Sequence, residues 1–180
     1  PFANKYALKF AMHRAQSLNN KKFVKQIKQL EETSIINAKQ FQKWAKILTD
    51  LGGMKTGSSY NQLLMSTMKN LIFTRAYRLS DILKTLKGMQ FSQNALLPEM
   101  DTLNLYNKIK RVDVPVYFIQ GKLDAVAPFD VAVNFYNYLQ AEHKTFVEFE
   151  RSAHMPHYEG PKRFSDLLKK TIANGTRRQL

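Results

Sequence analysis

The feature that most constrains the fold is a pair of short β-forming segments in the last third of the chain. Residues 114–119 form an almost unbroken apolar, β-branched run, which is typical of a strand covered on both faces. Residues 145–150 alternate between polar and apolar side chains, as expected of a strand with one face in water. A helical pattern over 129–141 separates them, and another begins at Pro161. Because parallel strands require a crossover connection, residues 112–173 predict a parallel strand–helix–strand–helix unit.

The first 110 residues carry only helical patterns. The segment 38–51 places apolar side chains on one stripe, and Gly52-Gly53 ends it. Further helical patterns cover the first 30 residues, 63–72 and 80–89. The sequence therefore predicts an all-helical region before the parallel unit. Two strands make a very small sheet, so we expect this unit to be the end of a larger one.

Charge and cysteine content exclude several classes of site. The chain has no cysteine, which excludes disulfides, a thiolate nucleophile and cysteine-ligated metal sites. No apolar run reaches the roughly 18 residues that a membrane span requires. Lysine and arginine number 28 against 14 acidic residues, a formal charge of +14. An apolar content of 44% is sufficient for a folded core, so the excess charge belongs to the surface of a globular protein.

The basic residues suggest one function other than catalysis. Four lysines lie within eight residues of one helical segment, at positions 21, 22, 25 and 28. A basic helical module that binds nucleic acid or another anionic surface is therefore an alternative function. No aromatic interleaving or known nucleic-acid motif accompanies these lysines, so an ordinary solvated surface is the favoured interpretation, and we expect neither nucleic acid nor membrane as a partner.

Two residues with catalytic chemistry follow the two predicted strands. Asp124 follows the first strand in a Gly-Lys-Leu-Asp turn, and His154 follows the second. The carboxyl ends of neighbouring parallel strands meet at one edge of the sheet, where ligands and catalytic groups collect. Neighbouring strands lie about 4.8 Å apart, so the carboxylate is expected to accept a hydrogen bond from the imidazole. A turn-forming Asp and a structural His are the competing interpretation.

These two motifs resemble those of the α/β-hydrolase fold family. Residues 114–128, VPVYFIQGKLDAVAP, are similar to its penultimate strand with the acid of a catalytic triad in a G-x-x-D turn. Residues 152–161, SAHMPHYEGP, are similar to its catalytic-histidine loop. The helical region is similar to the cap of the proline iminopeptidase-like branch in three segments: 19–22, 52–53 and 79–89. The resemblance covers essentially the whole chain, but only the second half of the family fold.

The resemblance implies a serine hydrolase in which Asp124 is the triad acid and His154 the general base. The family's nucleophile lies on a G-x-S-x-G turn between a strand and a helix. This sequence has no such turn: Gly53 and Gly57 are spaced correctly, but Lys55 lies between them. We therefore expect the serine upstream of Pro1, and we expect the 180 residues alone to be an inactive fragment. A chain that opens without Met fits that expectation.

Other chemical interpretations are weaker. His154, His157 and Glu159 could be read as metal ligands, but Pro156 between the histidines, the loop position and the absence of cysteine disfavour this interpretation. His157 and Glu159 are expected to order the loop or the start of the following helix. The resemblance implies no cofactor and no metal. Substrate-binding residues stay unassigned, and ester, amide and short-peptide substrates, including those of an aminopeptidase, remain open. Four aromatic residues are candidates either for a cleft or for the core: Trp44, Tyr60, Phe73 and Tyr77.

The sequence thus predicts an α/β fold, specifically the C-terminal part of an α/β-hydrolase fold preceded by an all-helical cap. Residues 1–110 are the expected cap and 111–180 the expected part of the catalytic domain. The expected partners are a small ester, amide or peptide substrate and the missing N-terminal half of the hydrolase domain. An unpaired edge of the first strand predicts self-association of the fragment. A cytoplasmic location is the default expectation.

Overall fold

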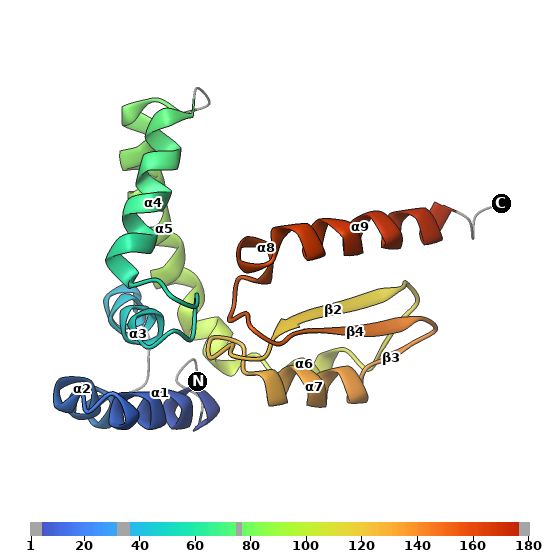
Figure 1. The fold of residues 1–180 in the computed structure, drawn as a ribbon, viewed down its shortest axis with the longest axis horizontal. Helices are drawn as coiled ribbons and strands as arrows, with labels where there is room; N and C mark the ends of the chain where they lie inside the picture. Colours follow the sequence, from blue (N-terminus) through green and yellow to red (C-terminus); the bar gives the residue numbers. More distant parts are fainter. Residues whose placement is uncertain (1–4, 32–36, 75–76, 177–180) are drawn as a thin grey trace.

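The computed structural model describes residues 5–31, 37–74 and 77–176. Helices come first along the chain, and two two-stranded parallel sheets with their own helices follow (Figure 1); the one with the longer strands is called here the sheet. The elements run in this order: α1 Lys5–Ser17, α2 Lys21–Glu31, α3 Ala38–Asp50, α4 Tyr60–Phe73, α5 Leu79–Thr102, α6 Leu105–Lys108, β1 Arg111–Val112, β2 Val116–Gly121, α7 Phe129–Tyr138, β3 Gln140–Ala141, β4 Lys144–Phe149, α8 Pro156–Glu159 and α9 Pro161–Thr176.

The core of the helical region lies between α1, α2 and α3. Three alanines of α1 are completely buried at a spacing of four residues, so they form one narrow stripe on which α2 packs closely. The loop after β2 adds Ala125 to this core, which fixes the helical region against the sheet. The other buried members of this core are Ile27, Leu30, Trp44, Ile47, Leu48 and Leu51.

The segment that connects α3 to α4, residues 51–59, is called here the α3–α4 loop. Gly52 adopts a left-handed conformation with φ of 83°, and the amide of Gly53 donates to the Leu48 carbonyl at 2.8 Å, which ends α3. A reciprocal capping box between Ser59 and Gln62 then begins α4. Both ends of the loop are therefore fixed by local hydrogen bonds that the sequence itself specifies.

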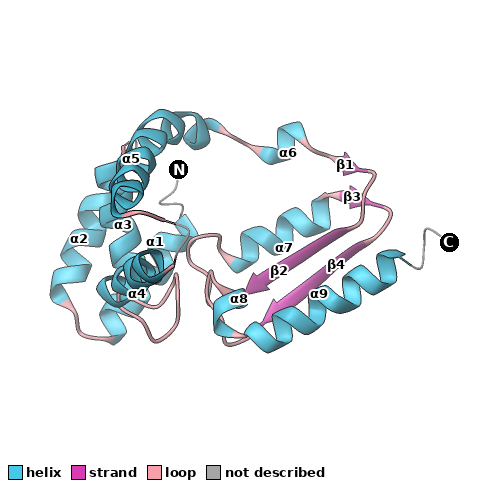
Figure 2. Ribbon diagram, turned by 90° about the horizontal axis from the view of Figure 1, so that it is seen from above, coloured by secondary structure: helices cyan, strands magenta, loops and turns pink. Residues whose placement is uncertain are grey.

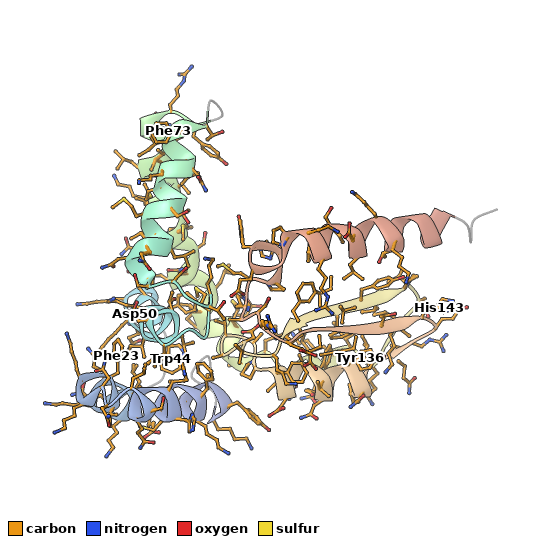
Figure 3. The ribbon with its side chains drawn as sticks, viewed as in Figure 1. Phe23, Trp44, Asp50, Phe73, Tyr136 and His143 are labelled. Atoms are coloured by element: carbon orange, nitrogen blue, oxygen red, sulfur yellow. The ribbon has the colours of Figure 1, made fainter. Side chains whose placement is uncertain are left out.

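Helices α4 and α5 form a hairpin that extends away from the sheet (Figure 1). Phe73 lies near the far end of this hairpin, whereas Trp44 points into the helical core, and His143 lies at the opposite extreme of the molecule (Figure 3). The Phe73 side chain is 83% exposed, and large apolar residues along α5 are exposed as well, including Leu83 and Phe91. This hairpin therefore contributes little to the core.

Strands β2 and β4 are parallel neighbours with a continuous register from Val116 opposite Lys144 to Gly121 opposite Phe149. Helix α7 lies on one side of the pair and α8–α9 on the other (Figure 1). A cluster of aromatic rings joins β2, β4 and α7, in which Phe118 stacks on Phe146 and contacts Phe135 edge-on. The strand–helix–strand–helix order expected from the sequence is present.

The structure differs from the sequence-based expectations in several details. Helix α5 continues to Thr102, well beyond the helical pattern expected over 80–89, with Pro98 inside it. The helix expected over 129–141 ends at Tyr138, because residues 140–141 form β3 and pair with β1. Strand β2 is also less covered than expected, and Tyr117 is 38% exposed. Helix α9 packs on β4, where Arg163 lies over the Phe149 ring and donates to the Glu148 carbonyl, so the helix leaves the neighbouring strand β2 partly open.

None of the described helices is both long and apolar enough to cross a membrane.

Candidate active site

Asp124 and His154 meet at the carboxyl ends of the two strands. The arrowheads of β2 and β4 point toward the same end of the sheet, beside α8 (Figure 2). Asp124 lies three residues after β2 and His154 five residues after β4. The His154 Nδ1 atom is 2.9 Å from Asp124 Oδ2, so the two residues that the sequence singled out form a hydrogen-bonded pair.

Four donors surround the Asp124 carboxylate. Its Oδ1 atom accepts from the amides of Val126 and Ala127 at 2.8 and 2.9 Å. Its Oδ2 atom accepts from Gln120 Nε2 at 2.8 Å and faces His154. The side chain is 4% exposed. A carboxylate has about four lone-pair positions, so this set of contacts fixes its rotation and aims one oxygen at the imidazole.

Gln120 is a contributor that the sequence analysis missed. Its amide nitrogen also donates to the Ala127 carbonyl at 2.7 Å, so it fastens the turn around Asp124. The sequence contains an indication of this role, because Gln120 is a polar residue that follows four apolar or aromatic residues at the end of a strand. A polar side chain at such a position requires a hydrogen-bond partner, and here Asp124 is that partner.

The imidazole of His154 is anchored on one side and open on the other. Its side chain is 40% exposed, and within the described part of the chain Nε2 has no hydrogen-bond partner. The hydrogen bond to Asp124 raises the pKa of His154 above its ordinary 6.5, partly opposed by burial and aided by the carboxylate charge. An imidazole with Nδ1–H held by a carboxylate presents Nε2 as a proton acceptor.

The raised pKa of His154 predicts a specific pH dependence of stability. A group whose pKa is higher in the folded state stabilises it fully below the unfolded pKa, and this contribution is lost as the pH rises through the folded pKa. The free energy of unfolding of the wild type, relative to a His154→Gln variant, should therefore be larger at pH 6 than at pH 8.5. Urea denaturation at both pH values measures it. An equal difference in unfolding free energy between wild type and variant at both pH values would contradict a stabilising contact between His154 and Asp124.

Two cavities flank the pair. One, of about 850 Å³, lies between α1 and the loop after β2 and is lined by Phe10, His13, Asp124 and Phe129, among others. The second, of about 660 Å³, lies between α4 and the His154 loop. Leu63, Ser66 and Asn70 line it from α4, and Met155 and Tyr158 line it from the other side. Each cavity is bordered by a neighbour of the imidazole in space or in sequence, Asp124 in the first and Met155 in the second.

The structure does not gather the four aromatic candidates into one cleft. Trp44 is part of the helical core, and Phe73 and Tyr77 are exposed near the α4–α5 connection. Tyr60 is half-buried at the start of α4, where its amide donates to Asp50. No described serine donates to His154: Ser59 caps α4, and Ser58 accepts from Lys55. The serine expected to complete a triad is therefore not among the residues whose contacts the structure describes.

The other candidate sites are placed as follows. Among the described residues, no group of three or more His, Asp or Glu side chains is arranged to hold a metal. His157 packs against Tyr158 and Phe164. Of the lysines of α2, Lys21, Lys25 and Lys28 line a groove of about 700 Å³ against α1, and within the described chain none of the three forms an ion pair.

The chain is similar to a protein named "Probable aminopeptidase YbaC" from Bacillus subtilis (strain 168). The two are 29% identical over 106 residues, which is 59% of this chain and 33% of that protein. The match thus spans about a third of the length of this relative. No family model and no solved structure matches the chain. The name of this relative describes that protein as a probable aminopeptidase.

Proposed function

We propose that these 180 residues are the C-terminal part of an α/β-hydrolase-fold serine hydrolase that cleaves amide or ester bonds. Asp124 orients His154, and His154 is the general base. The observation that carries the proposal is the 2.9 Å contact from Asp124 to His154 Nδ1, with Nε2 left without a partner among the described residues. The relative named a probable aminopeptidase supports amide substrates, such as those of the proline iminopeptidase type.

The proposed reaction is acyl transfer to water. Nε2 of His154 removes the proton from a serine hydroxyl as its oxygen attacks the substrate carbonyl, and the imidazolium then gives the proton to the leaving group. Water, activated by the same nitrogen, cleaves the acyl-enzyme. Asp124 stabilises the imidazolium at both stages. The serine and the oxyanion-hole amides are supplied by a segment outside these 180 residues, since no G-x-S-x-G turn occurs in them.

A covalent probe tests this proposal. The natural protein that carries this segment, together with the sequence encoded before Pro1, is treated with a fluorophosphonate, and hydrolysis of aminoacyl p-nitroanilides and p-nitrophenyl esters is followed. We expect labelling and turnover in that protein, and neither in residues 1–180 alone. Labelling of the 180 residues alone would show that the nucleophile lies within them. Absence of labelling and turnover in the longer protein would contradict the hydrolase function.

We also propose that residues 1–180 self-associate through the open edge of β2. In the described chain β2 pairs with β4 only, so its other edge has unpaired backbone groups, and Val114 and Tyr117 beside it are exposed. Such an edge readily pairs with another chain. We expect residues 1–180 to self-associate, with a sedimentation coefficient that rises with concentration. Tyr117→Lys should reduce this self-association, whereas Lys170→Glu on α9, which packs on the other strand β4, should not. A concentration-independent monomer would contradict the prediction.

The groove between α1 and α2 supports a second candidate function, the binding of an anionic surface. Lys21, Lys25 and Lys28 face it together without described ion pairs. If these three lysines each contact a phosphate, affinity for heparin or DNA should fall by about 40-fold between 50 and 200 mM salt. Lys25→Gln with Lys28→Gln should weaken retention on heparin, whereas Lys169→Gln with Lys170→Gln on α9 should have little effect. Equal weakening by both pairs would exclude this groove.

A further inference from the structure

The α3–α4 loop contacts both turns of the candidate active site. The carbonyl of Gly53 accepts from the amide of Ala125, which follows Asp124, at 3.0 Å. The carbonyl of Met54 accepts from the amide of His154 itself, also at 3.0 Å. Two consecutive carbonyls of one loop in the helical region therefore hold the backbone at both members of the pair.

A single carboxylate adds a third connection. Glu159 Oε1 accepts from the amide of Thr56 at 2.7 Å and from the Thr56 hydroxyl. Its other oxygen, Oε2, accepts from the amide of Ala153 at 2.8 Å. Glu159 is half-buried, and within the described chain it forms no ion pair with a cation. Hydrogen bonds to an ionised group are roughly twice as strong as neutral ones, so this carboxylate is a rigid link.

The position of His154 depends on these contacts because its own segment has little regular structure. Residues 150–155 form a turn between β4 and α8, without strand pairing to hold them. The amide of Ala153 is held by Glu159 and the next amide, that of His154, by Met54. Both anchors lead to the α3–α4 loop, which α3 and α4 in turn fix at its ends.

We infer that Glu159 is a positioning residue that couples the helical region, through Thr56, to the alignment of His154 with Asp124. This inference rests on the proposed function for its catalytic meaning, but its geometric content is independent of it. The same link fixes a wall of the 660 Å³ cavity, because Lys55, Gly57 and Ser58 of the loop line that cavity with Met155 and Tyr158. A ligand that moves the loop should thus disturb His154.

The titration of His154, followed by its imidazole Cε1–Hε1 NMR signal in residues 1–180, tests the inference. The signal is assigned by its loss in His154→Gln, which separates it from His157. In Glu159→Ala we expect the midpoint to fall by several tenths of a pH unit, because a displaced imidazole loses part of its bond to Asp124. Glu159→Gln, which keeps one acceptor oxygen, should show a smaller fall of the midpoint than Glu159→Ala. Asp166→Asn, which removes an exposed carboxylate from α9, is the matched control and should leave the midpoint unchanged.

Thr56→Val separates positioning from simple electrostatics. It keeps the negative charge of Glu159 and removes only the hydroxyl contact, so positioning predicts a smaller fall of the His154 midpoint in the same direction. If only the charge of Glu159 matters, Glu159→Ala and Glu159→Gln will lower the His154 midpoint equally, and Thr56→Val will leave it unchanged. That result would overturn the inference. Variants with lower melting temperatures but a wild-type His154 midpoint would overturn it as well.

Two features keep this test decisive. Amide spectra and thermal melts establish which variants fold, and if Glu159→Ala does not, Glu159→Gln and Thr56→Val give the answer. The readout requires no hydrolysis, so its failure and that of the proposed function are distinguishable. If a longer protein shows no turnover, the coupling of Glu159 to His154 is not affected by that result. If the His154 titration is the same in all variants, the hydrolase proposal is not affected.

Discussion

In the hydrolase proposed above, His154→Ala should reduce kcat by on the order of 10⁴- to 10⁶-fold, with little change in the fold. In serine proteases, loss of the triad histidine removes the base for attack and the acid for the leaving group, and the remaining rate comes from the oxyanion hole and binding. His154 is well placed for this role because Asp124 holds Nδ1 at 2.9 Å. Its partial exposure also predicts that truncation costs little stability.

His143→Ala is the matched control. His143 lies at the other end of the sheet and is exposed (Figure 3), so its removal should leave turnover unchanged. Asp124→Asn should reduce kcat by about 10⁴-fold, because the amide no longer favours the tautomer with Nδ1–H. Initial rates with a p-nitroanilide and p-nitrophenyl acetate measure all three variants. If His154→Ala retained more than about a hundredth of the wild-type turnover, a general acid–base role would be excluded.

The Asp124–His154 pair was predictable from the sequence because it depends on local patterns alone. One apolar and one alternating segment, with a helix between them, predict adjacent parallel strands, and the residues that follow such strands emerge at the same edge. The helix α3 and its end at Gly52-Gly53 were predictable for the same reason, since the apolar periodicity and the two glycines that end it all lie between residues 38 and 53.

The link from Thr56 to Glu159 was not predictable in the same way. The two residues are 103 positions apart, and their contact depends on how the helical region packs on the sheet, which no periodicity encodes. The same applies to β1 and β3. Two-residue strands are too short to show an alternating pattern, so the sequence did not predict them. Residues 140–141 were therefore assigned to the preceding helix, which in the structure ends at Tyr138. Local sequence patterns thus predict that Asp124 and His154 meet, whereas tertiary packing determines which residues support the pair.

Gly121→Ala should destabilise the fold and separate Asp124 from His154. Gly121 is the last residue of β2, and a Cβ atom there would lie 2.5 Å from the Ser152 carbonyl oxygen, 2.8 Å from the Ala153 carbonyl carbon and closer still to the Ala153 oxygen. These are backbone atoms of the His154 loop, so no side-chain rotation relieves the clash. The loop must move, and we expect a loss of about 1–3 kcal/mol in the free energy of unfolding.

Gly88→Ala is the matched control, since the substitution is identical and the environment opposite. Gly88 lies inside α5, and a Cβ atom there meets nothing within 4 Å. Alanine in a helix interior is favoured over glycine by about 0.5–1 kcal/mol, so this variant should be slightly more stable than the wild type. Urea denaturation and the NMR titration of His154 compare the two, and only Gly121→Ala should lower the titration midpoint. A Gly121→Ala variant with wild-type stability and an unmoved midpoint would mean that the strand ends are not held this closely, and the alignment of Asp124 with His154 would then need another cause.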